Sequence, residues 1–386
     1  MADLLPRRDL FRARLAAQLG TPPLQLECSG TAALLVALAT LRARAPDRDT
    51  VVVPAYTCPL VAIAVHRLGL RLRPCDTRPG HWDMDPNALA QLCDARTLAI
   101  VPTHLAGLVA DMQAPLALAR ACGAFVVEDA AQALGARVGD DSVGLRGDAG
   151  FFSLAAGKGL SLYEGGLLLA RDPALRTALA DTGARDVPHR PGWELRRSLE
   201  LLALALLYRP AGLGLAYGLP LRRALHRGDP VAAAGDDFPP GIPLHRVGRW
   251  RRGVGTRAAL RLPAFLAANR ERALARIERL RALPGLAVFG ESAGTRGSWP
   301  FLMLTMPSAR HADAALAELW PAGLGVARLF AHALPDYGYL GARVPCVRTP
   351  HAADFAARAL TISNSAWLDE AAFARIVEVL RRVLAS

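Results

Sequence analysis

The sequence predicts an α/β fold, with a mainly parallel sheet in a large first domain and a smaller α/β domain after it. Between residues 24 and 180, short β-rich runs alternate with helical stretches, which is typical of a parallel sheet covered by helices on both faces. At 386 residues the chain is also too large for one compact core. We expect two domains, 1–245 and 246–386.

The large domain begins with a short helix and continues with six strands. The first twenty residues combine arginines with leucines, so they predict an amphipathic helix and not a signal peptide, which needs an uncharged apolar core. The predicted strands are 51–56, 70–76, 98–104, 124–130, 149–154 and 166–171, with helices at 31–44 and 113–123. Ligands bind at the carboxyl ends of such strands. Polar residues that end these runs, such as His104 and Glu128-Asp129, are therefore candidate site residues.

Residues 182–248 interrupt this alternation and form an insertion rich in proline and glycine. Its apolar part, 198–221, is broken by Arg209-Pro210, so neither half reaches the roughly 20 apolar residues of a membrane span. A helical hairpin packed on the protein is the favoured interpretation. A surface-seeking segment with arginines at both ends, in peripheral contact with a membrane, stays open as the alternative.

The small domain is predicted to start with a long amphipathic helix. Residues 256–283 carry apolar residues at helical spacing with arginines on the outer face. A strand at 299–306, a helix at 309–323 and a final helix at 368–385 follow.

Charge and cysteine usage limit the classes of partner. The net charge is +12, yet the arginines are scattered, and no zinc-finger spacing or RNA-binding aromatic motif accompanies them. We therefore expect no nucleic acid as partner, while anionic substrates or an acidic lipid surface stay open. The six cysteines lie far apart with no CxxC pair, which indicates a reducing compartment and no metal site. The prediction is a cytoplasmic protein, with attachment to the periphery of a membrane as the variant.

Lys158 is the only lysine among 46 basic residues. Arginine stays protonated and is a poor nucleophile, whereas lysine can lose its proton and form an imine. Gly157 and Gly159 flank Lys158 and permit a close backbone approach. An arginine-rich composition that left one lysine by chance is the alternative, and the neighbouring elements decide between the two.

Two further elements point to a phosphate-bearing cofactor. Residues 29–34, SGTAAL, open a helix whose free amides and Thr31 hydroxyl form a phosphate cradle, although serine and threonine are common helix caps anyway. Asp129 ends a strand, where its carboxylate can keep the pyridine nitrogen of a pyridoxal cofactor protonated. Gln132 can reach the same ligand. An ordinary helix N-cap is the other interpretation of Asp129.

Four blocks together resemble the DegT/DnrJ/EryC1/StrS family, the sugar aminotransferases among the fold-type I enzymes that depend on pyridoxal phosphate (PLP). They are VVVPAYTCPLVAIAVHRLGLRLRPCDT, TLAIVPTHLAGLVADM, VVEDAAQALGA and FFSLAAGKGL. The resemblance covers nearly the whole chain except about 182–248. It implies the fold-type I PLP-transferase fold, pyridoxal 5'-phosphate as cofactor and a homodimer with active sites shared across the interface.

The resemblance also assigns roles to residues of the first half. Lys158 is implied to bind the cofactor covalently and to move the proton during transamination. Asp129 is implied to pair with the pyridine nitrogen and Gln132 to contact the phenolic side of the ring. The implied phosphate ligands are Thr31, Ala32 and Ser153. Family dehydratases carry histidine in place of the lysine, so Lys158 favours transamination.

Several positions depart from the family pattern. The aromatic residue that stacks on the ring falls at Cys58, which leaves stacking looser or supplied by Tyr56. The family's Asn-Tyr-Arg-Met motif aligns with residues 250–253, where Arg252 can still contact phosphate. His332 resembles a family histidine in a shortened loop. Arg252 and His332 are expected to act in the neighbouring subunit's site.

The function implied by the resemblance is transfer of an amino group from glutamate or glutamine to a ketone or aldehyde. The expected acceptor is a keto-sugar, nucleotide-linked in most of the family, in glycan or natural-product biosynthesis. Two alternatives stay open: a lipid-linked or lipophilic acceptor at a membrane surface, and a non-catalytic PLP-binding regulatory protein. The joint presence of Lys158, Asp129 and Gln132 speaks against the regulatory protein.

Overall fold

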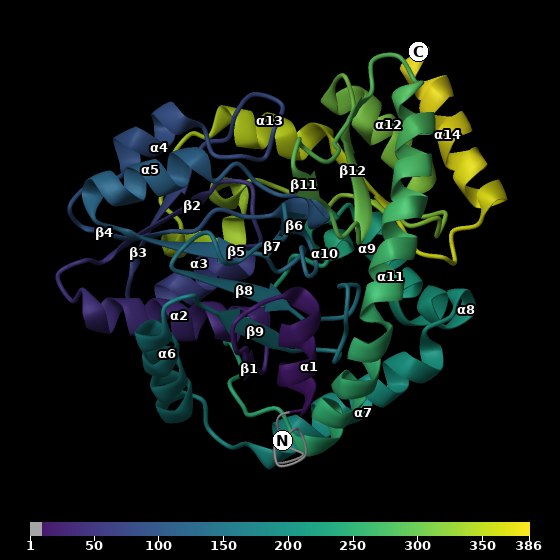
Figure 1. Cartoon of the computed structure of the whole chain (residues 1–386). Helices are drawn as coiled ribbons and strands as arrows, with labels where there is room; N and C mark the ends of the chain where they lie inside the picture. The colour runs from purple at the N-terminus through teal and green to yellow at the C-terminus, as the bar shows by residue number, and fades with distance from the viewer. Residues whose placement is uncertain (1–9) are drawn as a thin grey trace.

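The computed structural model describes residues 10–386, so half of the predicted N-terminal helix lies outside the described residues. Helix α1 (Leu10–Leu19) is the described part, and it packs against the long helix α11 (Arg249–Arg281) (Figure 1). Phe11 and Leu15 of α1 are buried in one cluster with Ala259 and Leu262 of α11. The first described helix of the large domain is thus joined to the helix that opens the second domain.

The centre of the molecule is a seven-stranded, mainly parallel sheet, as predicted. Its order is β1-β9-β8-β5-β4-β2-β3, with β9 and β1 antiparallel at one edge. The bounds are β1 (Gln25–Glu27), β2 (Thr50–Pro54), β3 (Arg71–Cys75), β4 (Thr97–Ile100), β5 (Phe125–Asp129), β8 (Ala149–Ser153) and β9 (Gly166–Leu169). Each of the six predicted strands is present, within a few residues of its expected ends.

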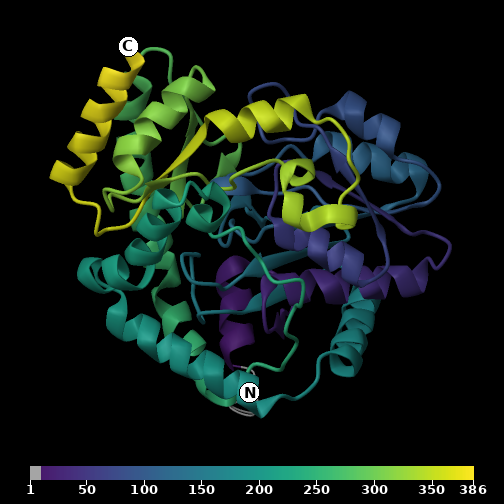
Figure 2. The same cartoon turned by 180° about the vertical axis from the view of Figure 1, so that it is seen from behind.

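Helices cover both faces of this sheet (Figures 1 and 2). The covering helices are α2 (Gly30–Arg44), α3 (Pro59–Arg67), α4 (Pro86–Leu92), α5 (Gln113–Cys122) and α6 (Pro173–Asp186). Alternate strand residues point to opposite faces. Val51 and Val53 therefore pack in the cluster that holds α2, α3 and α6, whereas Val52 packs in the cluster that holds α4 and α5.

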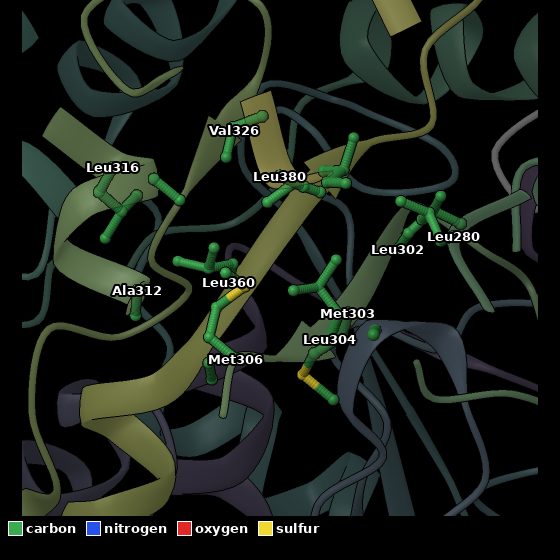
Figure 3. Close-up of a cluster of buried hydrophobic side chains, with 14 of the residues drawn as sticks. Leu280, Leu302, Met303, Leu304, Met306, Ala312, Leu316, Val326, Leu360 and Leu380 are labelled. Atoms are coloured by element: carbon green, nitrogen blue, oxygen red, sulfur yellow. The ribbon is translucent and has the colours of Figure 1, made fainter. Parts of the chain in front are cut away.

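A second, antiparallel sheet of order β10-β12-β14-β13 forms the C-terminal lobe. Its strands are β10 (Ala287–Val288), β12 (Phe301–Thr305), β13 (Val326–Ala327) and β14 (Ala359–Ser363), and its helices are α12 (Ala309–Leu319), α13 (Pro350–Arg358) and α14 (Glu370–Leu384). Leucine and methionine side chains from these elements and from α11 fill its core (Figure 3). The seven-stranded sheet uses only residues before 245 and the four-stranded sheet only residues after it, which supports the proposed boundary.

Smaller elements link the two lobes. A three-stranded sheet pairs β11 (Thr295–Arg296) with β6 (Arg137–Val138), and β6 pairs in turn with β7 (Asp141–Ser142). The single-turn elements are η1 (Leu105–Gly107), η3 (Leu334–Asp336) and η4 (Gly338–Arg343).

The insertion forms a helical hairpin, as predicted. It consists of α7 (Pro191–Leu207), α8 (Pro210–Leu213), η2 (Gly214–Gly218), α9 (Leu219–His226) and α10 (Pro230–Ala234). The chain turns at Arg209-Pro210 because proline fits the first turn of α8 but not the interior of a continuous helix. Among the described residues, no helix is long and apolar enough to cross a membrane.

Two expectations about helix faces are wrong. Most leucines of α7 face outward, so the hairpin does not bury its apolar side against the protein. The arginines of α11 are not all on its outer face, since Arg251 is fully buried and Arg276 nearly so. Both arginines reach backbone carbonyls in the interior, and hydrogen bonds of this kind offset the cost of burying a charge.

Candidate active site

The start of α2 meets the end of β8 at the carboxyl edge of the sheet. A Cβ atom added to Gly30 would lie 3.1 Å from Ser153 Cβ, so this close approach favours glycine. Thr31 and Ser153 thus lie at one place, as predicted. The Ala32 amide donates to Ser29 Oγ at 3.0 Å, and a phosphate would share that amide with the serine. The arrangement is a helix N-terminus beside hydroxyl groups, which suits an anion.

Asp129 is buried at the end of β5, beside Phe151 of β8. The His104 amide donates to the Asp129 carbonyl oxygen at 2.9 Å, and the Ala131 amide donates to Oδ1 at 3.0 Å. No helix begins at residue 130, so the alternative of an ordinary N-cap is wrong. Burial raises the pKa of Asp129 to about 6, although the Ala131 amide and Lys158 both act to lower it.

Lys158 lies in the turn between β8 and β9. Gly157 has φ of 82°, a conformation that favours glycine, and the Lys158 amide donates to the Ala155 carbonyl at 3.2 Å. Burial lowers the pKa of Lys158, while the charges of Cys58 and Asp129 act to raise it. Lys158, Cys58 and Asp129 come from three separate segments and share one electrostatic environment.

Cys58, the residue at which the resemblance led us to expect a stacking aromatic ring, is the N-cap residue of α3. The pKa of the thiol is raised to about 12, mainly by burial and to a smaller extent by the carboxylates of Asp236 and Asp129, while the Leu60 backbone and Lys158 act to lower it. The thiol is therefore neutral near pH 7 and is not an activated nucleophile.

Gln132 and Tyr56 take part in packing. Gln132 Oε1 accepts a hydrogen bond from the Ala106 amide at 3.0 Å, which fixes the turn that follows β4. Tyr56 is fully buried, with its ring 5.3 Å from Phe330 and 4.9 Å from Phe355, and its hydroxyl accepts from the Phe330 amide at 3.4 Å. Tyr56 is a core residue, and the prediction that it stacks on the cofactor is not supported, because its ring has no exposed surface.

Arg252 and His332 line other cavities. Arg252 borders one of about 860 Å³ between α6, α7 and the start of α11. His332 borders one of about 540 Å³ beside α12 and α13. Lys158 does not line either cavity. Neither cavity therefore connects Arg252 or His332 to Lys158 within one chain.

The structure adds a buried pair, His104 and Glu128, next to Asp129. His104 Nε2 lies 3.0 Å from Glu128 Oε2, and Nδ1 accepts from the Ala110 amide at 3.0 Å, so the proton sits on Nε2 of a neutral ring. Glu128 also accepts amides of Gly144, Arg146 and Gly147 at 2.9, 2.6 and 2.7 Å. Burial opposes ionisation of Glu128, but the His104 hydrogen bond and these amides lower its pKa overall. A carboxylate held this tightly fixes the strand end that carries Asp129.

His104 and Glu128 were among the candidate strand-end residues, whereas Arg251 and Asp236 were not singled out from the sequence. Arg251 Nε lies 3.0 Å from Glu194 Oε1, and Nη1 donates to the Glu164 carbonyl in the loop after Lys158 at 2.5 Å. Asp236 Oδ2, in the insertion, accepts the Ala331 amide at 2.7 Å and the Tyr337 hydroxyl at 2.6 Å. The insertion is thus attached to the loop after Lys158 and to the C-terminal lobe.

Comparison with known proteins identifies the first half of the chain. Residues 5–186 match the model of the DegT/DnrJ/EryC1/StrS aminotransferase family. Protein MosB of Rhizobium meliloti is 36% identical over 173 residues, which are 45% of this chain and 34% of that protein. A putative L-glutamine:3-amino-2,3-dideoxy-scyllo-inosose aminotransferase of Streptomyces kanamyceticus is 34% identical over 189 residues, 48% of this chain and 43% of that protein. The chain thus matches less than half the length of these relatives.

The whole chain matches solved structures in its fold. The aminotransferase TlmJ from Streptoalloteichus hindustanus superposes with a TM-score of 0.75 and 23% identity, over 99% of this chain and 91% of that one. The fold therefore extends through the region where the sequences diverge. Residues 5–186 thus match the DegT/DnrJ/EryC1/StrS aminotransferase family in sequence, and the whole chain shares the fold of TlmJ.

Proposed function

We propose that the protein is an aminotransferase that uses pyridoxal 5'-phosphate. The observation that carries this proposal is the meeting of the only lysine, Lys158, with the buried carboxylate of Asp129 at one edge of the sheet. The residues fit the cofactor. The start of α2 with Thr31 and Ser153 suits its phosphate, and Asp129 suits its pyridine nitrogen. When bound, the cofactor supplies an electron sink for a carbanion.

The chain's own residues then have separate tasks. The lowered pKa of Lys158 raises the fraction of neutral amine, which can attack an aldehyde carbon and later carry a proton between two carbon atoms. Asp129 would hold a proton at the ring nitrogen of the cofactor. The positive charge of that protonated nitrogen would favour the ionised carboxylate of Asp129, although burial alone disfavours it. The pair His104 and Glu128 keeps the strand end of Asp129 in position.

The substrates are proposed as glutamate or glutamine for the amino donor and a keto-sugar for the acceptor. The relative from Streptomyces kanamyceticus is named for a glutamine-dependent reaction on a cyclic ketone, which supports this class. The exposed leucines of α7 favour a second candidate acceptor, a lipid-linked or lipophilic carbonyl compound.

We also propose a cytoplasmic homodimer in which Arg252 and His332 complete the partner's site. Within one chain, both residues line cavities whose walls do not include Lys158, so a role in catalysis requires the second subunit.

The test of the reaction is a spectroscopic titration with PLP. We expect a visible absorbance band with the wild type, bleaching on addition of glutamate or glutamine, and neither signal with Lys158→Arg, because arginine cannot form the imine. Arg310→Lys, which adds a lysine on the exposed face of α12, is the matched control and should behave as the wild type. Turnover by Lys158→Arg would refute the assignment, and a band that no amino donor bleaches would favour the regulatory alternative.

The acceptor is found by screening with the same protein. Keto-sugar nucleotides and lipophilic aldehydes are each offered together with glutamate or glutamine. Amination of the sugars alone supports the leading proposal, whereas amination of the aldehydes alone replaces it with the second candidate.

A further inference from the structure

Helix α7 presents a stripe of leucines to solvent. Leu195, Leu199, Leu202 and Leu206 recur at the spacing of one helix face and are between 47 and 70% exposed. The helix lies at the edge of the molecule, away from the seven-stranded sheet, in both views (Figures 1 and 2). Contiguous apolar side chains are seldom left exposed to water, so a stripe of this length indicates a binding surface.

The opposite face of α7 is polar and holds the helix on the protein. Glu194 pairs with the fully buried Arg251, and Arg197 pairs with Glu164. Leu201 is the leucine of this helix that is buried. The orientation is the reverse of the usual one, in which charges face solvent and leucines face the core. The ion pairs therefore fix the leucine stripe outward.

The returning arm of the hairpin extends the apolar surface. Tyr208, Leu215 and Tyr217 are 46, 67 and 51% exposed. Aromatic residues with a polar tip suit the boundary between an apolar phase and water. Both arms of the hairpin thus carry exposed apolar side chains, and we name residues 191–228 the hairpin face.

The charges in the second part of the hairpin face, residues 201–228, are all positive. Residues 201–228 contain four arginines and neither aspartate nor glutamate. They are Arg209, Arg222, Arg223 and Arg227. Within the described part of the chain, none of the four forms an ion pair. An apolar stripe with unpaired arginines matches lipid chains below anionic headgroups.

We propose that the hairpin face docks in the plane of an anionic phospholipid bilayer. The leucines and tyrosines enter the boundary between headgroups and acyl chains, and the arginines bind lipid phosphates. A second copy of the chain suits the face less well, because two copies would bring the four arginines of each chain into one interface, and residues 201–228 hold no acidic residue to pair with them. The proposal goes beyond the aminotransferase reaction and does not depend on it.

The test measures sedimentation of the full-length protein with vesicles, without cofactor or substrate. We expect binding to vesicles that contain phosphatidylglycerol and at least roughly tenfold weaker binding to pure phosphatidylcholine. Leu202→Ser with Leu206→Ser should weaken binding by about tenfold or more, because two apolar anchors are lost. Leu260→Ser with Leu274→Ser removes two exposed leucines of α11 and is the matched control, with binding unchanged.

A second pair of variants tests the charges. Arg222→Gln with Arg223→Gln should weaken binding to phosphatidylglycerol vesicles by roughly tenfold, and added salt should weaken wild-type binding as well. Arg310→Gln with Arg375→Gln, two arginines of the C-terminal lobe without an ion pair to described residues, should leave binding unchanged. Circular dichroism of each variant checks that it is folded.

Three results would overturn the proposal. The first is no binding to anionic vesicles by the wild type. The second is binding that survives Leu202→Ser with Leu206→Ser. The third is a larger assembly in light scattering that these leucine changes dissociate, since a second copy would then cover the face. Failure of the PLP titration leaves the vesicle result unaffected, so the two proposals fail separately.

Discussion

At the scale of single residues, Asp129 is proposed to bind the cofactor, yet burial of its ionised carboxylate lowers the stability of the folded chain. Its pKa is raised by burial to about 6 in the folded chain, above the ordinary value of an unfolded chain. Folding therefore favours the protonated acid. The stability that protonated Asp129 contributes is fully present below the pKa of an unfolded aspartate, and it is lost as the pH rises through about 6.

We predict that Asp129→Asn stabilises the cofactor-free protein at pH 7.5 by about 3 kcal/mol and has little effect at pH 4. The reason is that asparagine keeps an oxygen for the Ala131 amide but carries no charge to desolvate. Urea unfolding at both pH values measures the difference. The exposed Asp140→Asn is the control, and equal stability of wild type and Asp129→Asn at pH 7.5 would contradict the argument.

Part of the site was predictable from residue types and their order. Lys158 was singled out as the only lysine, and Asp129 and Thr31 were singled out at a strand end and a helix N-terminus, which lie at one edge of a parallel sheet. The core position of Tyr56 was not predictable, because the local sequence around an aromatic residue in a loop is the same whether its ring contacts a ligand or packs in the interior.

At the scale of elements, a buried arginine holds helix α7. Arg251 is fully buried and bonds to both oxygens of Glu194, so neither charge is left alone. Removing one partner of a buried pair is more costly than removing both, because it leaves an uncompensated charge.

We predict that Arg251→Ala lowers the free energy of unfolding by about 3–5 kcal/mol and frees α7 from the protein. Hydrogen exchange over 191–228 should rise strongly. The neighbouring Arg249→Ala, which alters an exposed arginine, is the control. If Arg251→Ala with Glu194→Leu is as unstable as the single change, the ion pair is not what holds the helix.

The elements were easier to predict than their orientation. Alternation of apolar and polar runs gave the six strands and the hairpin, because periodicity reflects burial along one segment. The outward turn of α7 depends on Glu194 meeting Arg251 across 57 residues, and no local pattern contains that contact.

At the scale of the whole molecule, the proposed homodimer predicts complementation. Lys158→Arg and His332→Ala should each be inactive alone. In a mixed dimer, one site has a normal Lys158 from one subunit and a normal His332 from the other. Random mixing at equal amounts should therefore restore up to about a quarter of wild-type activity.

The measurement is turnover after the two variants are unfolded and refolded together. Two Lys158→Arg preparations refolded together are the control and should stay inactive. An inactive mixture that light scattering shows to be dimeric would place His332 outside the partner's site.

More of the fold than of the oligomeric assembly could be predicted from the sequence. The large sheet is visible in runs of apolar residues, which reflect what one chain buries, whereas only β12 of the four-stranded sheet was predicted. Contacts with a second subunit are harder to predict, because an apolar residue such as Leu260 of α11, which is exposed in the described chain, has the same sequence pattern with or without a partner.

The contacts at the base of the insertion decide how its removal can be interpreted. Glu200 of α7 shares Arg197 with Glu164, in the loop after Lys158. Excision of 198–221 would take Glu200 away and alter that loop together with the outer surface. Lost turnover in such a truncated protein would then not reveal whether the surface or the loop was responsible. Substitutions confined to the outward side chains change the surface and leave the base of the insertion whole.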